Sequence, residues 1–262
     1  MLPYIKVISL TIKEEFQYRL HILIRIIISL IPLLSQVYLW ITLYSNTANI
    51  SGYGFNEMIT YTVIAKLLYE IITPTVNWQI YSEIVNGEIT KYFIRPVSFL
   101  RYWFTRNIGV KIVSLTVSSI LILTVIIFKS IFLLPSISYF GLFIISCVLS
   151  LILFFFIYYV ISLLAFWFTD VWAFFFMAGN LITFGSGALI PLNMLPDPLY
   201  TILNFMPFSK LIYFPINIFL ERINFTEIIK GFGLQVIWII LFMLLANWLY
   251  RIGTKKYIAP GG

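Results

Sequence analysis

The chain has 262 residues, of which 61% are hydrophobic and only 10% are charged, and its mean hydropathy is +0.99. Soluble domains carry about 25% charged residues, so this composition excludes a solvated globular surface and indicates a membrane protein. The net charge of +7 does not indicate nucleic-acid binding, because basic residues beside hydrophobic segments are expected on the cytosolic side of membrane proteins. The single cysteine, Cys147, excludes a disulfide framework and a cysteine-based metal site within one chain.

Six apolar segments are each long enough to cross a hydrocarbon core of about 30 Å, which takes about 20 helical residues. The sequence therefore predicts an all-α polytopic protein with one transmembrane domain over residues 1–262. The expected spans are residues 22–44, 58–76, 108–128, 139–168, 171–190 and 232–250. The segment before them, Met1–His21, is too charged to cross. Its end predicts an amphipathic helix at the membrane interface, with Phe16, Leu20 and Ile24 on one side.

The segment between the fifth and sixth spans, Pro191–Pro215, holds five of the eleven prolines yet stays apolar. A continuous helix is excluded there, because each internal proline removes a hydrogen bond and clashes with the preceding turn. Irregular apolar backbone at membrane depth is tolerated only where protein or a wet cavity surrounds it. We therefore expect a re-entrant helical hairpin of two short helices at residues 191–215.

Lysine and arginine residues outside the spans are unevenly divided. Eleven lie in the N-terminal segment, around the loop between the second and third spans, and in the C-terminal tail. The opposite side carries Lys129, Lys210, Arg222 and Lys230. Because basic residues favour the cytosolic side, the sequence predicts that both termini and that loop are cytosolic and that the proline-rich hairpin faces outward.

The loop at residues 78–106 is the longest segment between apolar runs that is not itself a span. Ser82 can cap a short helix, and Gly87 permits a sharp backbone turn. Arg95 is disfavoured in a helix because Pro96 follows it. We interpret the loop as a cytosolic docking element. The alternative is a loop whose charges only set the topology.

Two ionisable residues of the second span, Lys66 and Glu70, are functional candidates because charges inside a membrane are costly. They are four residues apart, so they share a helix face and can pair. They either line a substrate path or a gate between subunits, or they form a local ion pair. Gly185 and Gly187 at the end of the fifth span are candidates for the same gate; close helix packing is the alternative.

No G-x-x-x-x-G-K-[ST] phosphate loop occurs in the chain. With His21 as the single histidine, neither a His-x-x-x-His zinc site nor a Ser-His-Asp triad can be built. We therefore expect no enzymatic activity and no directly bound cofactor. Any nucleotide energy must enter from another protein.

Three stretches resemble the membrane subunit of ABC-2-type exporters, specifically a bacterial permease group of similar length. Glu15–Ile24 is similar to that family's interfacial helix. Val85–Arg106, which includes NGEITKYFIRP, resembles its loop between the second and third spans. Ser186–Leu220 resembles its extracellular re-entrant signature. Phe93, where an aliphatic residue is expected, and Lys210 in the outer hairpin depart from the family pattern.

The resemblance implies a half-transporter of the bacterial inner membrane. It would pair with a second permease copy or a sister permease, and with separate cytosolic ABC ATPase subunits that bind ATP and magnesium. The first, second and fifth spans would line the interface between permeases. The residues that would couple to the ATPase are Ser82, Glu83, Gly87, Glu88, Arg95 and Pro96. The apolar spans suggest an amphiphilic cargo, such as an antimicrobial peptide, a drug or a lipid-like molecule.

Two other classes of function stay open on the sequence. One is a non-transporting scaffold or sensor that recruits a cytosolic partner through the same loop. The other is a channel or secondary transporter that needs no ATP. A secondary transporter usually has internal repeats and broken helices in both halves, whereas this chain breaks its apolar backbone in one place.

Overall fold

The computed structural model describes residues 2–17, 19–94, 97–127 and 132–256. The regular structure of these residues is helical, apart from one β-hairpin whose two strands have two residues each. The elements in chain order are α1 (Leu2–Gln17), α2 (Arg19–Leu43), β1 (Asn49–Ile50), β2 (Tyr53–Gly54), α3 (Phe55–Ile72), α4 (Asn77–Val85), the 3-10 helix η1 (Glu88–Tyr92), α5 (Phe99–Ile127), α6 (Ile137–Leu163), η2 (Leu164–Phe166), α7 (Trp172–Gly185), η3 (Leu192–Met194), α8 (Asp197–Phe205), η4 (Phe208–Lys210), α9 (Tyr213–Phe219) and α10 (Phe225–Lys256). The two strands pair antiparallel, with Ile50 opposite Tyr53.

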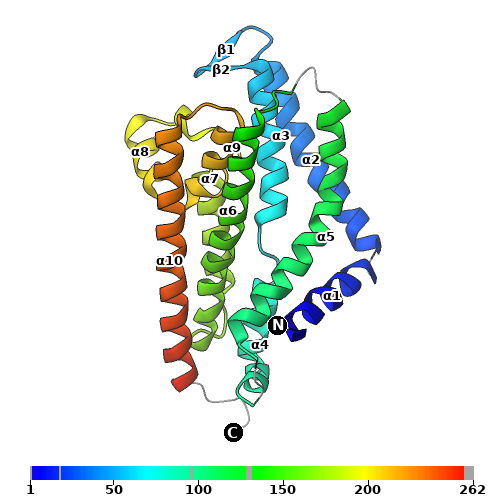
Figure 1. Cartoon of the computed structure of the whole chain (residues 1–262), viewed down its shortest axis with the longest axis vertical. Helices are drawn as coiled ribbons and strands as arrows, with labels where there is room; N and C mark the ends of the chain where they lie inside the picture. Colours follow the sequence, from blue (N-terminus) through cyan, green and yellow to red (C-terminus); the bar gives the residue numbers. More distant parts are fainter. Residues whose placement is uncertain (1, 18, 95–96, 128–131, 257–262) are drawn as a thin grey trace.

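The long helices run along the long axis of the molecule, and successive ones alternate in direction (Figure 1). The α4 and η1 helices lie at one end, and α10 runs toward it. The β-hairpin, α8 and α9 lie toward the other. We call these the α4 end and the hairpin end. Along the axis, α6 packs against α10, and α3 packs against α2 and α5.

Helices occur in all six ranges that were expected to span a membrane. Two of them, α6 with η2 and α10, are long and apolar enough to cross by length and composition. A bent pair, α8 and the continuous stretch Phe208–Phe219, adds a third if its two arms, which meet at 72°, form one broken span. The α7 helix and the part of α2 at Ile27–Leu43 are shorter apolar helices. The described residues therefore form a helical membrane protein, and the full number of spans stays a prediction.

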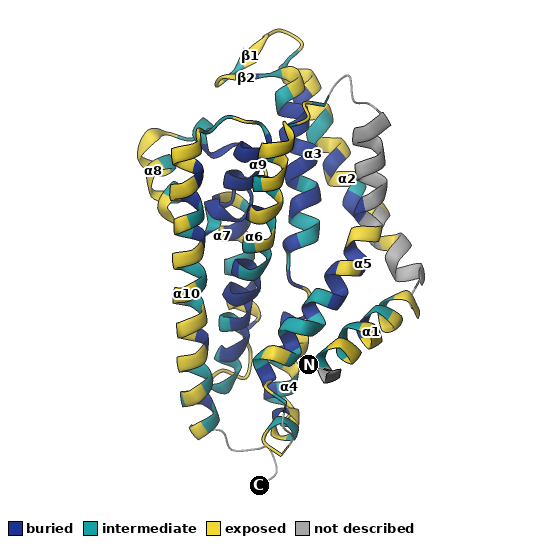
Figure 2. Cartoon of the chain, viewed as in Figure 1, coloured by how far each residue is buried: buried dark blue, intermediate teal, exposed yellow. Residues whose placement is uncertain are grey.

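The buried residues are concentrated at the centre of the helix bundle. Figure 2 shows long buried stretches on α3 and α6, whereas α10 is largely exposed along its outer side. Large apolar side chains are also exposed on α2 and α7; Leu34, for example, is 64% exposed and Phe184 is 67% exposed. Such extensive apolar surface is unusual on a soluble monomer. It suits contact with lipid or with another membrane protein.

Local chemistry explains where several helices begin and end. The α3 helix ends at Ile72, four residues before the end of the expected second span, because Pro74 disfavours the helical region for Thr73. In the proline-rich segment, Pro196 and Pro207 precede the first residues of α8 and η4. Proline is tolerated at a helix start, where its missing N–H has no intrahelical partner to lose.

The N-terminal segment differs from the single interfacial helix that was expected to carry Phe16, Leu20 and Ile24 on one side. Phe16 belongs to α1 and Ile24 to α2, and the two helices meet at an angle (Figure 1). The α1 helix lies against α5, where a Cβ on Gly109 would be 2.9 Å from Thr11. The absence of a side chain at this glycine therefore lets the two helices approach closely.

Candidate functional site

The α4 and η1 helices form a compact element that is fixed to the bundle by one apolar face. Ile80 and Ile84, one helical turn apart, are 1% exposed, and Ile89 of η1 is fully buried. They pack into a cluster that includes Phe99 and Trp103 of α5. This i, i+4 spacing gives α4 an amphipathic character, so its opposite face is free to meet solvent or a partner.

A carboxylate orders the turn between the two helices. Glu83 accepts a hydrogen bond from the Lys91 ammonium at 2.6 Å and another from the Trp103 indole at 3.1 Å. Lys91 also reaches Glu88 at 3.2 Å. The Glu83 side chain is 13% exposed and that of Glu88 is 58% exposed. Glu83 thus joins α4, η1 and α5, whereas Glu88 contributes at the surface.

The ionisation of this cluster follows from its surroundings. Burial by itself lowers the pKa of Lys91, but the two carboxylates outweigh that effect and raise it. Lys91 is therefore charged at neutral pH. Burial, with a further contribution from the Glu83 charge, raises the pKa of Tyr92 far above its ordinary value, so its phenol stays neutral.

The predicted docking residues have different places in this element. Gly87 precedes η1 with a φ of +85°, a left-handed conformation that glycine adopts without strain. Ser82 does not cap a short helix as expected. It lies inside α4, which begins after Val76, and its hydroxyl accepts a hydrogen bond from the Asn86 side chain at 2.9 Å. The break in the backbone around Pro74 lets α4 begin earlier than the loop sequence indicated. Arg95 and Pro96 lie outside the described residues.

Three contacts that the sequence did not predict connect α4 to the neighbouring helices. The Tyr81 hydroxyl donates to the Thr169 carbonyl, in the turn before α7, at 2.6 Å. The Ser162 hydroxyl of α6 donates to the Asn77 carbonyl at 3.2 Å. The rings of Trp78 and Phe175 of α7 are 4.7 Å apart. These residues are separated by more than 80 positions, so no local sequence pattern signals the contacts.

The exposed side of the element combines polar and apolar groups. A pocket of about 380 Å³ lies between α4 and the start of α5, and Ser82, Glu83, Glu88 and Arg106 are among its lining residues. Beyond η1, Phe93 is 50% exposed and Ile94 is 83% exposed. Two large apolar side chains thus stand out at the end of the molecule rather than along its apolar flanks.

Comparison with known proteins identifies the family. The family model described as ABC-2 family transporter protein matches residues 30–261, which is most of the chain. The chain belongs to the ABC-2 transporter family. This match confirms the resemblance inferred from the sequence and makes the chain a membrane permease of an ABC transporter. A comparison with curated proteins finds no match.

The candidate gate residues of this permease lie on α3 and around the end of α7. Lys66 and Glu70 are partly buried on α3, and the local ion pair that was one of the two alternatives for them is not present among the described residues. Gly185 is the last residue of α7, and Gly187 lies beyond it with a φ of +79°. The Gly187 carbonyl accepts a hydrogen bond from the Tyr61 hydroxyl at 2.6 Å. Gly187 therefore fixes the chain after α7 against α3.

A cluster around Arg222 at the hairpin end of the permease has no signal in the sequence. The Arg222 guanidinium lies 3.8 Å from the centre of the Tyr53 ring, donates to the Gly52 carbonyl at 3.1 Å and pairs with Glu57. Burial raises the pKa of Tyr53 to about 12, and the Arg222 charge opposes part of that rise. The cluster joins the β-hairpin and α3 to the segment between α9 and α10.

Replacing Arg222 with lysine should lower the free energy of unfolding by about 1–2 kcal/mol, because an ammonium cannot stack on a ring and bind two acceptors as a planar guanidinium does. Thermal unfolding in detergent micelles would measure the change. Arg101→Lys, at an exposed position of α5, is the matched control and should change the stability by less than about 0.5 kcal/mol. Equal effects of the two substitutions would contradict the role given to Arg222.

The described residues contain no group of three or more histidine, cysteine, aspartate or glutamate side chains that could hold a metal ion. The side-chain chemistry of the site consists of two carboxylates, Glu83 and Glu88, two cations, Lys91 and Arg106, and exposed apolar groups. Such a surface can bind a protein and transmit its movement.

Proposed function

We propose that this permease is one half of the membrane part of an ATP-driven exporter, and that a cytosolic ABC ATPase docks on the α4–η1 element. The permease would pair with a second copy of itself or with a sister permease. The observation that carries the proposal is the construction of α4–η1. One face is buried in the bundle, and the large apolar side chains of Phe93 and Ile94 are exposed just beyond η1, at the end of the molecule toward which α10 runs.

In the proposed topology, α2, α3, α5, α6, α7 and α10 cross the membrane. Their alternating directions along one axis support six crossings (Figure 1). The distribution of basic residues supports a cytosolic α4 end, with α1 at the cytosolic interface of a bacterial inner membrane. The segment from η3 to α9 then forms the re-entrant hairpin on the outer side, where the 72° bend between its arms supports a turn back.

Energy enters through the partner in this proposal. The permease sequence has no phosphate loop, so ATP and magnesium bind to the ATPase subunits. Closure of the ATPase moves α4, and the contacts of α4 with Ser162 of α6 and with Thr169 before α7 pass the movement to the bundle. The apolar surfaces of the crossing helices favour an amphiphilic cargo.

The docking proposal is tested by placing a charge at the most exposed apolar position near η1. Ile94→Asp should reduce recovery of the ATPase with the purified permease at least tenfold, because a carboxylate desolvated in an apolar contact is costly. The measurement is co-purification in detergent, followed by titration of the ATPase onto immobilised permease.

A matched control uses the same substitution at the hairpin end. Ile137, at the start of α6, is 92% exposed, and Ile137→Asp should leave ATPase recovery unchanged. If Ile94→Asp binds the ATPase as well as the control does, α4–η1 is not the docking element.

Transport is tested separately in vesicles that contain the permease and its ATPase. ATP-dependent movement of a fluorescent amphiphile that is lost in Ile94→Asp supports the exporter. Recruitment of the ATPase without any transport would indicate a scaffold or sensor. Flux from the permease alone, without ATP, would indicate a channel or a secondary transporter.

A further inference from the structure

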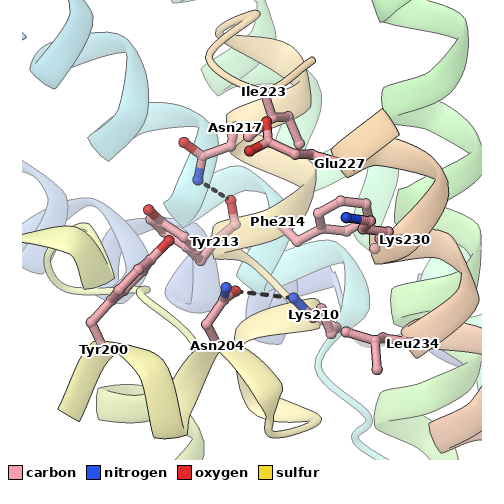
Figure 3. Close-up of a pocket in the computed structure, with 11 residues that line it drawn as sticks. Tyr200, Asn204, Lys210, Tyr213, Phe214, Asn217, Ile223, Glu227, Lys230 and Leu234 are labelled. Atoms are coloured by element: carbon pink, nitrogen blue, oxygen red, sulfur yellow. Dashed lines mark hydrogen bonds between the residues drawn. The ribbon is translucent and has the colours of Figure 1, made fainter. Parts of the chain in front are cut away.

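A pocket of about 260 Å³ lies between α8, α9 and α10 at the hairpin end (Figure 3). One part of its wall is apolar and includes Phe214, Ile223 and Leu234. Another part is polar and includes Asn204, Lys210 and Lys230. A cavity with this mixed lining suits a ligand that has both a charged group and an apolar part.

Lys210 is the unusual group in this wall. It is only 4% exposed, and its ammonium donates to the Asn204 side-chain oxygen at 3.1 Å and lies 5.4 Å from the centre of the Phe214 ring. Figure 3 shows Lys210 directed at Asn204. An amide oxygen and a ring face compensate a buried charge only in part, since burial of an ion is costly without an opposite charge.

The backbone of Lys210 is held firmly. Its carbonyl accepts hydrogen bonds from the Ser150 hydroxyl of α6 and the Gln235 side chain of α10, each at 2.9 Å. The backbone position of Lys210 is therefore fixed by two long helices. The ammonium is thus buried at a position that contacts with α6 and α10 fix.

Glu227, the acidic residue of the pocket wall, already uses its carboxylate in a local hydrogen bond. Glu227 accepts a hydrogen bond from the Asn224 backbone N–H, and the Asn224 side chain accepts one from the Glu227 N–H, both at 2.9 Å. This reciprocal pair caps the start of α10. Among the described residues no ion pair involves Lys210, and exposed Lys230 adds a second positive charge to the pocket wall.

We propose that this pocket binds a phosphate group, carried either by an anionic phospholipid or by free inorganic phosphate. Phosphate supplies the negative charge that Lys210 lacks, and its several oxygens can accept from both lysines. The apolar wall and the exposed apolar side chains nearby on α8, Ile202 and Phe205, suit the glycerol and acyl chains of a lipid. The proposal does not depend on which ATPase drives the permease.

The test measures binding to the purified full chain in an uncharged detergent. One arm titrates inorganic phosphate at constant ionic strength, and the other titrates dioleoylphosphatidylglycerol in mixed micelles, with uncharged dioleoylglycerol as its comparison. The wild type should bind at least one of the two phosphate probes. Lys210→Met should weaken that binding at least tenfold. Lys255→Met removes the same charge at an exposed position near the opposite end of α10 and should bind like the wild type.

A second variant keeps the test decisive if Lys210→Met folds poorly. Asn204→Asp places a carboxylate beside the Lys210 ammonium, so it should weaken phosphate binding at least tenfold while the unfolding temperature stays the same or rises. Binding of the lipid alone identifies a headgroup site, and binding of inorganic phosphate alone identifies a free-anion site. The proposal is overturned if neither probe binds, if dioleoylglycerol binds as well as the anionic lipid, or if Asn204→Asp binds like the wild type.

Discussion

The Gly187→Ala variant is expected to lose about 2–5 kcal/mol of stability. The φ of Gly187 is +79°, and an L-residue held in the left-handed region costs about 1–2 kcal/mol. The new Cβ would also lie 2.8 Å from the Tyr61 hydroxyl and 3.0 Å from the Tyr213 Cβ. Overpacking of a filled site adds about 1–3 kcal/mol, because neither α3 nor α9 can move away without disturbing its own buried neighbours.

Equilibrium unfolding in mixed micelles would measure this loss, and Gly185→Ala is the matched control. A Cβ at Gly185 would meet Leu203 and Phe208 at 3.4 Å, and its backbone is helical. Alanine also favours a helix over glycine by about 1 kcal/mol. Gly185→Ala should therefore be close to neutral. Similar losses in the two variants would show that the turn after α7 is not what requires glycine.

A double-mutant cycle separates the two causes. Tyr61→Phe removes the hydroxyl that the new Cβ would approach, together with its hydrogen bond to the Gly187 carbonyl. Gly187→Ala should cost less in the Tyr61→Phe background than in the wild type, because one of its clashes is absent. The remaining cost measures the backbone strain. A Gly187→Ala variant that folds normally but transports poorly would instead support the gate that the sequence suggested.

The Glu83→Ala variant should lose about 2 kcal/mol of stability and most of its coupling to the ATPase. The Glu83 carboxylate binds the Lys91 ammonium and the Trp103 indole and is largely buried. Removing it leaves a buried indole N–H without its acceptor, and an unsatisfied buried group costs about 1–3 kcal/mol. It also removes the carboxylate that links Lys91 of η1 to Trp103 of α5, so the exposed residues beyond η1 are held less firmly.

Thermal unfolding and stimulation of the ATPase by the reconstituted permease would measure the two effects. Glu88→Ala is the matched control, since it removes the other carboxylate of the same lysine. Glu88 is 58% exposed, and exposed ion pairs contribute about 0–1 kcal/mol. Glu88→Ala should thus be nearly neutral in stability. A larger loss of stability in Glu88→Ala than in Glu83→Ala would refute the ordering role assigned to Glu83.

Helical class and family could be predicted because both depend on local sequence. Long apolar runs produce helices wherever a backbone must satisfy its own hydrogen bonds, and the prolines at positions 196 and 207 mark helix starts. The similarity of the loop and the hairpin to the permease group needed only contiguous residues. These features can be recognised in one sequence without knowledge of any tertiary contact.

The arrangement of the candidate site depended on contacts that a single sequence does not encode locally. Trp103 lies 20 positions from Glu83, and Thr169 lies 88 positions from Tyr81. Helical spacing placed Lys66 and Glu70 on one face, but it could not fix their side-chain conformations, and the pair does not form. Spacing predicts which residues can meet, whereas competing partners and packing decide which do.

Because α10 is long, the stability of its packing depends on temperature differently at its two ends. Its 32 residues extend about 48 Å at a rise of about 1.5 Å per residue, well beyond a hydrocarbon core of about 30 Å. At the α4 end, Gly253 packs so closely on Phe166 that a Cβ would lie 2.3 Å from its ring. In the proposed orientation this contact lies at the cytosolic end of the two helices, the end nearest to water. Apolar burial from water has a large heat capacity and weakens on cooling.

Deeper in the membrane, the same two helices are held by van der Waals packing rather than by exclusion of water. One helix pair is thus stabilised by two forces with different temperature dependence. Cooling should therefore loosen the packing at the end that faces the proposed ATPase before it affects the part within the lipid. The ATPase would then be uncoupled from a helix bundle that is still intact.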